Sequence, residues 1–255
     1  MLNNPLISSN YWLGMLKALV VSVAIIATPA HSDILGIADG QAFAPTQFQE
    51  LTLDLAGRTQ ADSQRFGIRI TLPRFLDHYA LFVEAGSSQG EWEDLAINGK
   101  TEFSGSGNGA GLYFKGIPDW KNFSTTLKFS FYNEENNVDT PIVVSGRVAS
   151  VDQDKRQVSA KALFSPTDPI SAKGLNAYVA LGLVSTRSSR AVFVDQQEEA
   201  RLARSDSYVN AYLAAGVVYP MNRFRLYAVA EVQEEVSLSM GIRWHFTKTT
   251  KKAAL

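Results

Sequence analysis

The 255-residue chain contains no cysteine and only three histidines. The absence of cysteine excludes disulfides, iron–sulfur clusters and thiolate zinc sites. The 24 basic and 25 acidic side chains nearly cancel, so bulk charge gives no reason to expect nucleic acid as a partner. Beyond residue 32, no uninterrupted apolar run approaches the roughly 18 residues that a membrane-spanning helix needs. This part of the chain is therefore not expected to carry a helical membrane anchor.

The first 32 residues have the pattern of a secretory signal peptide. A single lysine precedes an uncharged apolar run at residues 18–27, and small residues follow it in TPAHS. The run is too short to cross a bilayer, and the order of charge, apolar core and small residues is that of an export signal. Cleavage after Ala30 or after Ser32 fits this pattern, and Met15 is an alternative start. We predict that residues 1–32 are a signal peptide and that the chain is exported.

Most of the remaining chain alternates apolar and polar residues with a period of two, which is the period of a β-strand. The clearest example is EVSLSMGIRWHF (235–246), where every second residue from Val236 onward is apolar. Only residues 194–204 are convincingly helix-prone. Turn-forming stretches separate the alternating segments, at 57–63, 72–78, 115–122, 165–174, 219–222 and 233–235. Short strands with regular turns predict an all-β sandwich or barrel.

The two faces of these strands favour a membrane barrel over a soluble one. The apolar face carries almost no charge, whereas the other face carries the charges together with many glycines and tyrosines. A lipid-facing exterior and a crowded polar lumen have this pattern. We predict a closed antiparallel up-and-down transmembrane β-barrel over residues 47–246, preceded by a short periplasmic segment (33–46) and followed by a basic tail (247–255). The alternative is a soluble periplasmic β-barrel that binds a small apolar ligand.

The strand number follows from the requirement that both ends of such a barrel lie on the periplasmic side, which makes the number even. Counting from each end leaves VVSGRVASV (143–151) unassigned. A full span there would give an odd total, so we expect it to be a strand-like part of an outer loop. This yields ten strands, with eight or twelve as alternatives. The predicted outer loops are 93–101, 133–155 and 185–206, and we expect loops to carry any binding specificity.

Residues 236–246 resemble the C-terminal strand of Gram-negative outer-membrane β-barrel proteins, which ends in an aromatic residue and serves as an assembly signal. The resemblance implies an outer-membrane location, contact with outer-membrane lipid, and recognition by the barrel assembly machinery. In that class the final aromatic residue is usually the last residue of the chain, whereas here nine residues follow Phe246. We therefore expect an internal signal. Its residues are Met240, Ile242, Trp244 and Phe246.

The sequence contains no recognisable catalytic, cofactor-binding or metal-binding set. His31 lies at the cleavage site, His78 lies in a predicted turn, and His245 has no serine at a spacing that implies a nucleophile and base. No histidine or carboxylate cluster has the spacing of metal ligands. The glycine-rich stretch 105–111 lacks the lysine and helix of a phosphate loop. We therefore expect no enzyme activity and no cofactor, with an outer-membrane hydrolase as the remaining alternative.

The charges of the non-apolar face are expected to form a network inside the barrel, because buried charges must be paired or solvated. A ten-strand bore lies near the size that side chains fill, so we expect a structural, adhesion-like or narrow-pore (porin-like) role. We expect Asp54, Arg65, Arg69 and Arg243 to be coupled, with Asp54 as a partner of Arg69. The predicted network comprises Glu50, Asp54, Arg65, Arg69, Glu84, Lys128, Lys161, Arg225, Glu231 and Arg243.

Overall fold

The computed structural model describes residues 51–60, 62–72, 78–94, 99–115, 122–138, 142–144, 147–194, 197–198, 203–233 and 235–246. The predicted signal peptide, the segment 33–46, the basic tail, His31 and Glu50 lie outside these residues. No helix in the described ranges is long and apolar enough to cross a membrane.

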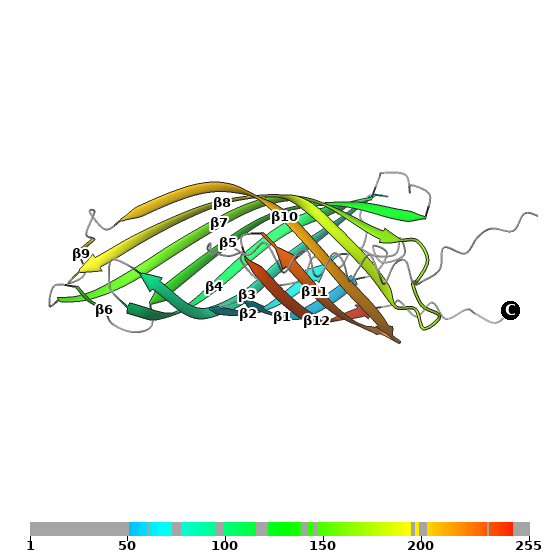
Figure 1. The fold of residues 1–255 in the computed structure, drawn as a ribbon, viewed down its shortest axis with the longest axis horizontal. Helices are drawn as coiled ribbons and strands as arrows, with labels where there is room; N and C mark the ends of the chain where they lie inside the picture. The colour runs from blue at the N-terminus through cyan, green and yellow to red at the C-terminus, as the bar shows by residue number, and fades with distance from the viewer. Residues whose placement is uncertain are drawn as a thin grey trace, which may run out of the picture.

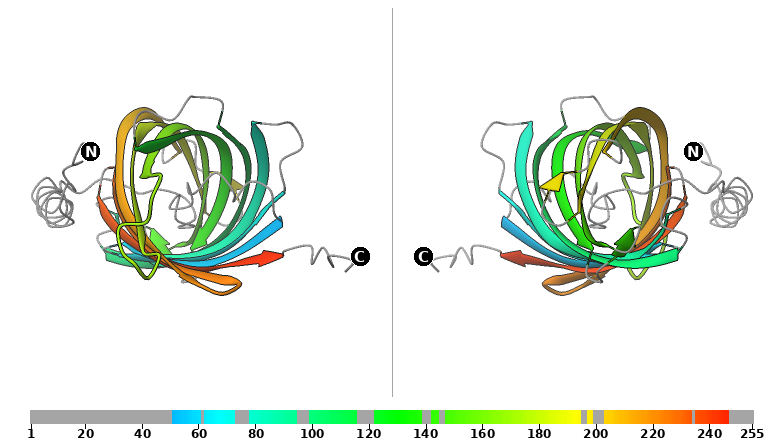
Figure 2. Two further views of the ribbon diagram at one scale, coloured as in Figure 1. Left: turned by 90° about the vertical axis from the view of Figure 1, so that its right-hand side faces the viewer. Right: turned by 90° about the vertical axis from the view of Figure 1, so that its left-hand side faces the viewer.

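Ten antiparallel strands form a closed barrel around a central lumen (Figures 1 and 2). Each pairs with its neighbour in the chain, and β1 pairs with β12 to close the ring. Two short strands, β6 (Ile142–Val144) and β9 (Gln197–Glu198), extend the edges of β7 and β8. The barrel strands are β1 (Leu51–Gln60), β2 (Ser63–Thr71), β3 (Tyr79–Asp94), β4 (Gly99–Phe114), β5 (Phe123–Val138), β7 (Arg147–Pro166), β8 (Asn176–Val194), β10 (Arg204–Met221), β11 (Phe224–Val232) and β12 (Val236–Phe246). The predicted ten-stranded up-and-down barrel is confirmed.

The strands run further into the predicted outer loops than the residue composition indicates. Strands β1 and β2 are joined through residues 61–62 instead of a loop at 57–63, and β8 and β10 occupy most of 185–206. The stretch 143–151 lies in β6 and the start of β7, which pair with each other. Polar side chains mark these segments as loops in the sequence, but ladder hydrogen bonds involve only the backbone and tolerate polar residues on both faces.

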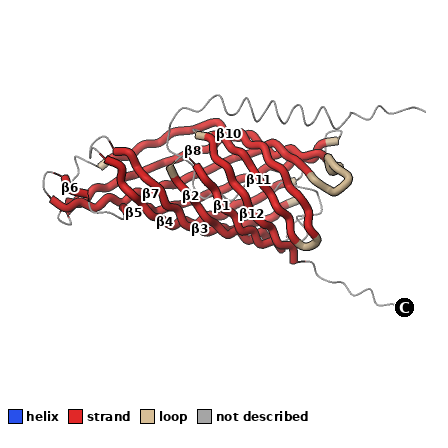
Figure 3. The backbone as a smooth tube through the Cα atoms, turned by 60° about the horizontal axis from the view of Figure 1, so that its bottom comes forward, coloured by secondary structure: helices blue, strands red, loops and turns tan. Residues whose placement is uncertain are grey.

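The barrel wall has two parts of different height. Strands β11, β12, β1 and β2 contain 9–11 residues, and we call them the short wall. Strands β3, β4, β5, β7, β8 and β10 contain 16–20 residues, and we call them the long wall. Figure 3 shows the short wall lying between β10 and β3. A tilted strand of about 9–11 residues spans the apolar layer of a membrane, so the short wall has the length of one span and the long wall exceeds it.

The outer surface of the barrel is apolar. Large apolar side chains alternate along the strands with buried inward residues, and several are more than half exposed, such as Phe66, Leu183 and Met240. We call this surface the apolar belt. At the end of the barrel near the C-terminus, aromatic rings cluster on it: Trp244 lies 4.9 Å from Phe224 and 5.6 Å from Phe246 between ring centroids. In a soluble protein the apolar side chains face the interior and the polar ones face outward, whereas in this barrel the arrangement is inverted.

Candidate functional site

Aromatic rings on the lumen side lie against glycines of the neighbouring strand. Tyr227 is the register partner of Gly241, and Tyr178 is the register partner of Gly216. A methyl group at either glycine would collide with the facing tyrosine ring. The glycines therefore let the rings lie along the wall and fill the bore. Two further pairs of the same kind are Tyr132 with Gly109 and Phe82 with Gly111.

One side of the lumen is filled mainly by apolar and tyrosine side chains. We call it the apolar side, and it is formed mostly by β7, β8, β10 and β11. Lys161 enters it from β7, with Nζ 3.6 Å from the centroid of the Tyr212 ring. A cation over an aromatic face is attracted by the ring quadrupole. The buried members are Ala56, Leu163, Tyr178, Ala180, Val184, Tyr212, Ala214, Tyr227 and Val229.

The opposite side, formed by β12, β1, β2 and β3, is held by ion pairs, and we call it the charged side. Arg69 donates to Glu84 from Nε at 2.8 Å and from Nη2 at 2.5 Å, and its Nη1 donates to the Tyr113 hydroxyl at 2.9 Å. Arg243 donates to both oxygens of Asp54, at 2.7 and 3.1 Å. Arg69 is only 1 % exposed, so these donors are used by side chains and not by bulk water. The two pairs stand at neighbouring positions of one register row on the lumen face.

A second layer of polar contacts lies nearer the end of the barrel that is away from Phe246. Arg58 forms an ion pair with Glu231 at 3.2 Å and donates to the Ser237 hydroxyl at 2.5 Å. Arg65 on β2 reaches Glu134 on β5 with Nη2 3.6 Å from Oε1, although two strands separate them in the sheet. Both residues are buried, yet Arg65 Nε, Arg65 Nη1 and both Glu134 oxygens lack a hydrogen-bond partner among the described residues. The Arg65–Glu134 pair is therefore looser than the pairs of Arg69 and Arg243.

The structure places most of the sequence-predicted charges on the lumen face. Asp54, Arg65, Arg69, Glu84, Lys128, Glu231 and Arg243 are buried, while Lys161 and Arg225 are partly exposed. Arg69 donates to Glu84, a member of the predicted network that was not expected as its partner. Asp54 stands opposite both Arg69 and Arg243 in the register, and both of its oxygens accept hydrogen bonds from Arg243.

Sequence reasoning missed Arg58, Gln60 and Glu134 because they lie in stretches interpreted as loops. The signal that could have found them is strand parity. Arg58 and Gln60 continue the inward series of Asp54 on β1, and Glu134 continues that of Tyr132 on β5. Gln60 donates to Glu235 at 2.6 Å, which ties the β1–β2 end of the short wall to the β11–β12 turn.

The two histidines in the described residues lie in different environments. His78 is exposed in the turn before β3, and His245 is buried on the inward face of β12. In the described part of the chain, no group of three or more histidine or acidic residues could hold a metal ion.

The four residues of the predicted assembly signal all face outward on β12. Met240, Ile242, Trp244 and Phe246 are each at least two-fifths exposed. Because residues 237–246 of β12 pair with β1, these side chains lie directly beside the seam where the first and last barrel strands meet.

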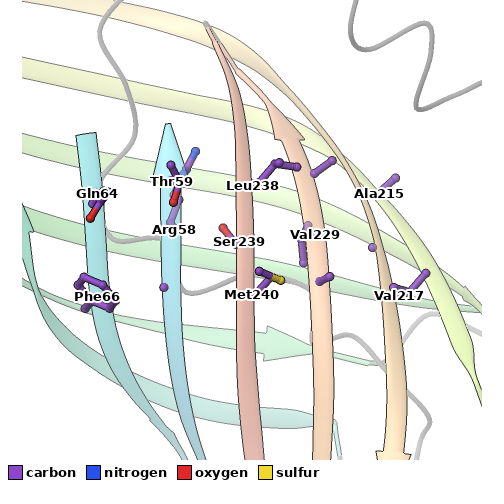
Figure 4. A pocket seen from close by; sticks show the side chains of 14 residues that line it. Arg58, Thr59, Gln64, Phe66, Ala215, Val217, Val229, Leu238, Ser239 and Met240 are labelled. Carbon is purple, nitrogen blue, oxygen red and sulfur yellow. The ribbon is translucent and has the colours of Figure 1, made fainter. Parts of the chain in front are cut away.

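An open apolar depression of about 590 Å³ also lies on the outer surface, not in the lumen (Figure 4). Small residues such as Gly57, Ala215 and Ala228 form part of its lining beside the larger Phe66 and Met240. The soluble-barrel alternative expected a site for a small apolar ligand, and this depression is part of the apolar belt.

No family model and no curated protein matches the chain. Among solved structures, it is similar to the translocator domain of the autotransporter NalP from Neisseria meningitidis, with a TM-score of 0.45, 11% identity, and coverage of 93% of this chain and 96% of that one. It is similar to the N-terminal β-barrel domain of Pseudomonas aeruginosa OprF, with a TM-score of 0.35, 12% identity, and coverage of 78% and 98%. A major outer membrane protein from Thermus thermophilus is also similar, with a TM-score of 0.36, 11% identity, and coverage of 77% and 98%.

Proposed function

We propose that the chain is an integral outer-membrane barrel whose lumen is closed by side chains and whose long wall projects from the membrane. The observation that carries the proposal is the apolar belt, which continues around the barrel on both walls. Burying a Leu or Phe side chain in an apolar phase is worth about 1.5–3 kcal/mol, so a belt this large is strongly unfavourable in water. A membrane satisfies it, whereas a soluble periplasmic barrel would leave it exposed.

The proposal includes export and assembly. The apolar run at 18–27 supports export, and the exposed side chains of β12 support recognition of the last strand by the barrel assembly machinery. Replacing Phe246 with Ala should slow insertion while leaving the inserted barrel's fold unchanged, because its ring faces outward and not into the lumen. This effect is measured by pulse-labelling the protein in cells. The folded barrel migrates differently on gels before and after boiling, and the rate at which this heat-modifiable form appears reports insertion. Lys248→Ala in the tail is the matched control.

A role in structure or surface attachment fits this geometry better than transport of bulky solutes or catalysis. The Arg69 and Arg243 layer consists of buried, hydrogen-bonded side chains on the lumen face, which supports a closed bore. The long wall has 16–20 residues per strand, of which about 9–11 are needed to span the membrane, so six strands continue past the belt. The extension supplies a rigid surface outside the bilayer, where binding residues are commonly placed.

A narrow ion path is the second candidate, and the loose Arg65–Glu134 pair favours it. Buried polar groups without protein partners are usually satisfied by water, so this layer can be hydrated. In planar bilayers, the closed-lumen proposal expects the wild-type protein to conduct little. The ion-path candidate expects small, steady channels whose cation preference changes in Glu134→Gln.

Fractionation tests the membrane proposal directly. The protein should stay with membranes in alkaline carbonate, require detergent for extraction, and migrate differently on gels before and after boiling. Release by osmotic shock without detergent would instead support the soluble alternative. Trypsin added to intact cells should cut at Arg201, in the connection between β8 and β10, if the long wall points outward. Cleavage only after permeabilisation would invert the orientation.

A further inference from the structure

Two arginines stand opposite each other on the outer face of the long wall. Arg156 on β7 and Arg187 on β8 are register partners, and both are exposed. Directly opposed Cβ atoms in an antiparallel pair lie about 4.5–5.5 Å apart, and like charges at this distance are destabilising. The pair therefore concentrates two positive charges at one point of the wall.

The described residues do not neutralise this charge. By register, the nearest outward carboxylates are Glu135 and Asp154, which face each other one row further from the apolar belt. Neither arginine forms an ion pair or a side-chain hydrogen bond with these carboxylates, or with any other residue that the structure describes. Both guanidinium groups thus keep their donors available for an external anion.

The next row of outward residues on the other side of the arginines from Glu135 and Asp154 is the edge of the apolar belt. It runs through Phe131, Val158, Ser185 and Val209, which are successive register partners on β5, β7, β8 and β10. These residues border an open depression of about 480 Å³ that also includes Ala160. On the short wall, the outward residues at the corresponding end are uncharged, such as Thr59 and Gln64. The long wall therefore combines an apolar depression with an arginine pair that lies one row beyond the edge of this depression.

We propose that this surface binds one membrane lipid that carries a phosphate headgroup. The two guanidinium groups hold the phosphate oxygens through charge-assisted hydrogen bonds, for which arginine has the matching planar donor geometry. An acyl chain lies in the depression below. The inference rests on the proposed membrane location, because only then does the depression face acyl chains. A second copy of the chain fits less well, since a symmetric contact through this surface would bring four arginines together.

The test uses full-length protein in a non-ionic detergent and native mass spectrometry to count retained lipids. The probes are dimyristoyl phosphatidic acid, the diacylglycerol with the same chains, and inorganic phosphate as a competitor. Wild type should retain one phosphatidic acid and no diacylglycerol at matched concentration. Arg156→Gln with Arg187→Gln should bind it roughly ten- to hundredfold more weakly, the loss expected when charged hydrogen bonds are removed. Ala160→Phe, which fills the depression, should also weaken binding.

The matched control is Arg223→Gln, which removes an exposed arginine from the β10–β11 turn at the other end of the barrel and should bind as wild type does. Unchanged binding by the double variant, or by Ala160→Phe, would overturn the inference. So would inorganic phosphate that competes as well as the lipid, because the site would then recognise a free anion. Every variant is first checked for heat-modifiable migration. A protein that membranes release without detergent refutes the proposed function, whereas an inserted, heat-modifiable protein with unaffected lipid binding refutes this inference alone.

Discussion

The charged side and the apolar side of the lumen fill the same bore in different ways. On the charged side, Arg69 and Arg243 each hold a carboxylate through two donors. On the apolar side, tyrosine rings lie over glycines, and Ala180 and Val184 fill the space between them. Removing one partner of an ion pair destabilises the fold, because the other charge stays buried without a partner. Packed rings are destabilised by a substitution that adds atoms to the space they occupy. The two sides should therefore respond to opposite kinds of substitution.

The largest effect is expected on the charged side. Arg69→Ala leaves the carboxylate of Glu84 buried without its partner and should lower the free energy of unfolding by about 3–5 kcal/mol, less if water enters. It should also raise conductance in planar bilayers. Urea unfolding in lipid vesicles and single-channel recording measure the two effects.

The pairing seen in the structure makes this prediction sharper. Arg69→Ala with Glu84→Ala should recover more stability than Arg69→Ala with Asp54→Ala, because Arg243 already holds Asp54. Equal recovery by the two double variants would mean that the network does not divide into these pairs. A single variant identical to wild type would place Arg69 outside the lumen.

An intermediate effect is expected on the apolar side. Gly216→Ala drives a methyl group into the Tyr178 ring and should cost about 1–3 kcal/mol, the range for overpacking a filled core. Gly57→Ala is the matched control, because its new methyl group would meet the ring of Phe66 on the outer surface at 3.3 Å and the Arg65 carbonyl oxygen at 3.8 Å. In a Tyr178→Ala background the Gly216→Ala cost should disappear. If the cost persists in that background, the glycine is required by the backbone conformation and not by the space that the Tyr178 ring occupies.

The smallest effect is expected at Lys161, a charged residue that lies on the apolar side of the lumen. Lys161→Met removes the cation over the Tyr212 ring and should cost about 0.5–2 kcal/mol. Lys161→Arg keeps a cation at the same place and should retain most of the stability. Urea unfolding of both variants separates the two cases, and equal losses would assign the effect to the shape of the side chain instead of its charge.

Much of the barrel could be predicted because its alternation is local. Asp54, Arg69 and Arg243 belong to segments with an unbroken period of two, so their common lumen face followed from parity alone. The strand ends that carry Arg58 and Glu134 were harder to predict, because these residues lie among polar residues that resemble a loop. Backbone pairing by neighbouring strands continues there regardless of side-chain polarity.

The sequence by itself determined the all-β class and which face of each strand is apolar, because these properties depend on residues that are close together in the chain. The choice of ten strands over eight or twelve used the further requirement that the number be even. Only the tertiary structure decided which charges pair. Asp54 faces two arginines in the register, and the structure shows Arg243 donating to both of its oxygens and Arg69 donating to Glu84. The same holds for Arg156 and Arg187, which are 31 positions apart and become neighbours only through the register of β7 and β8. Strand register depends on the closed hydrogen-bond ladder of the whole barrel, which no single segment specifies.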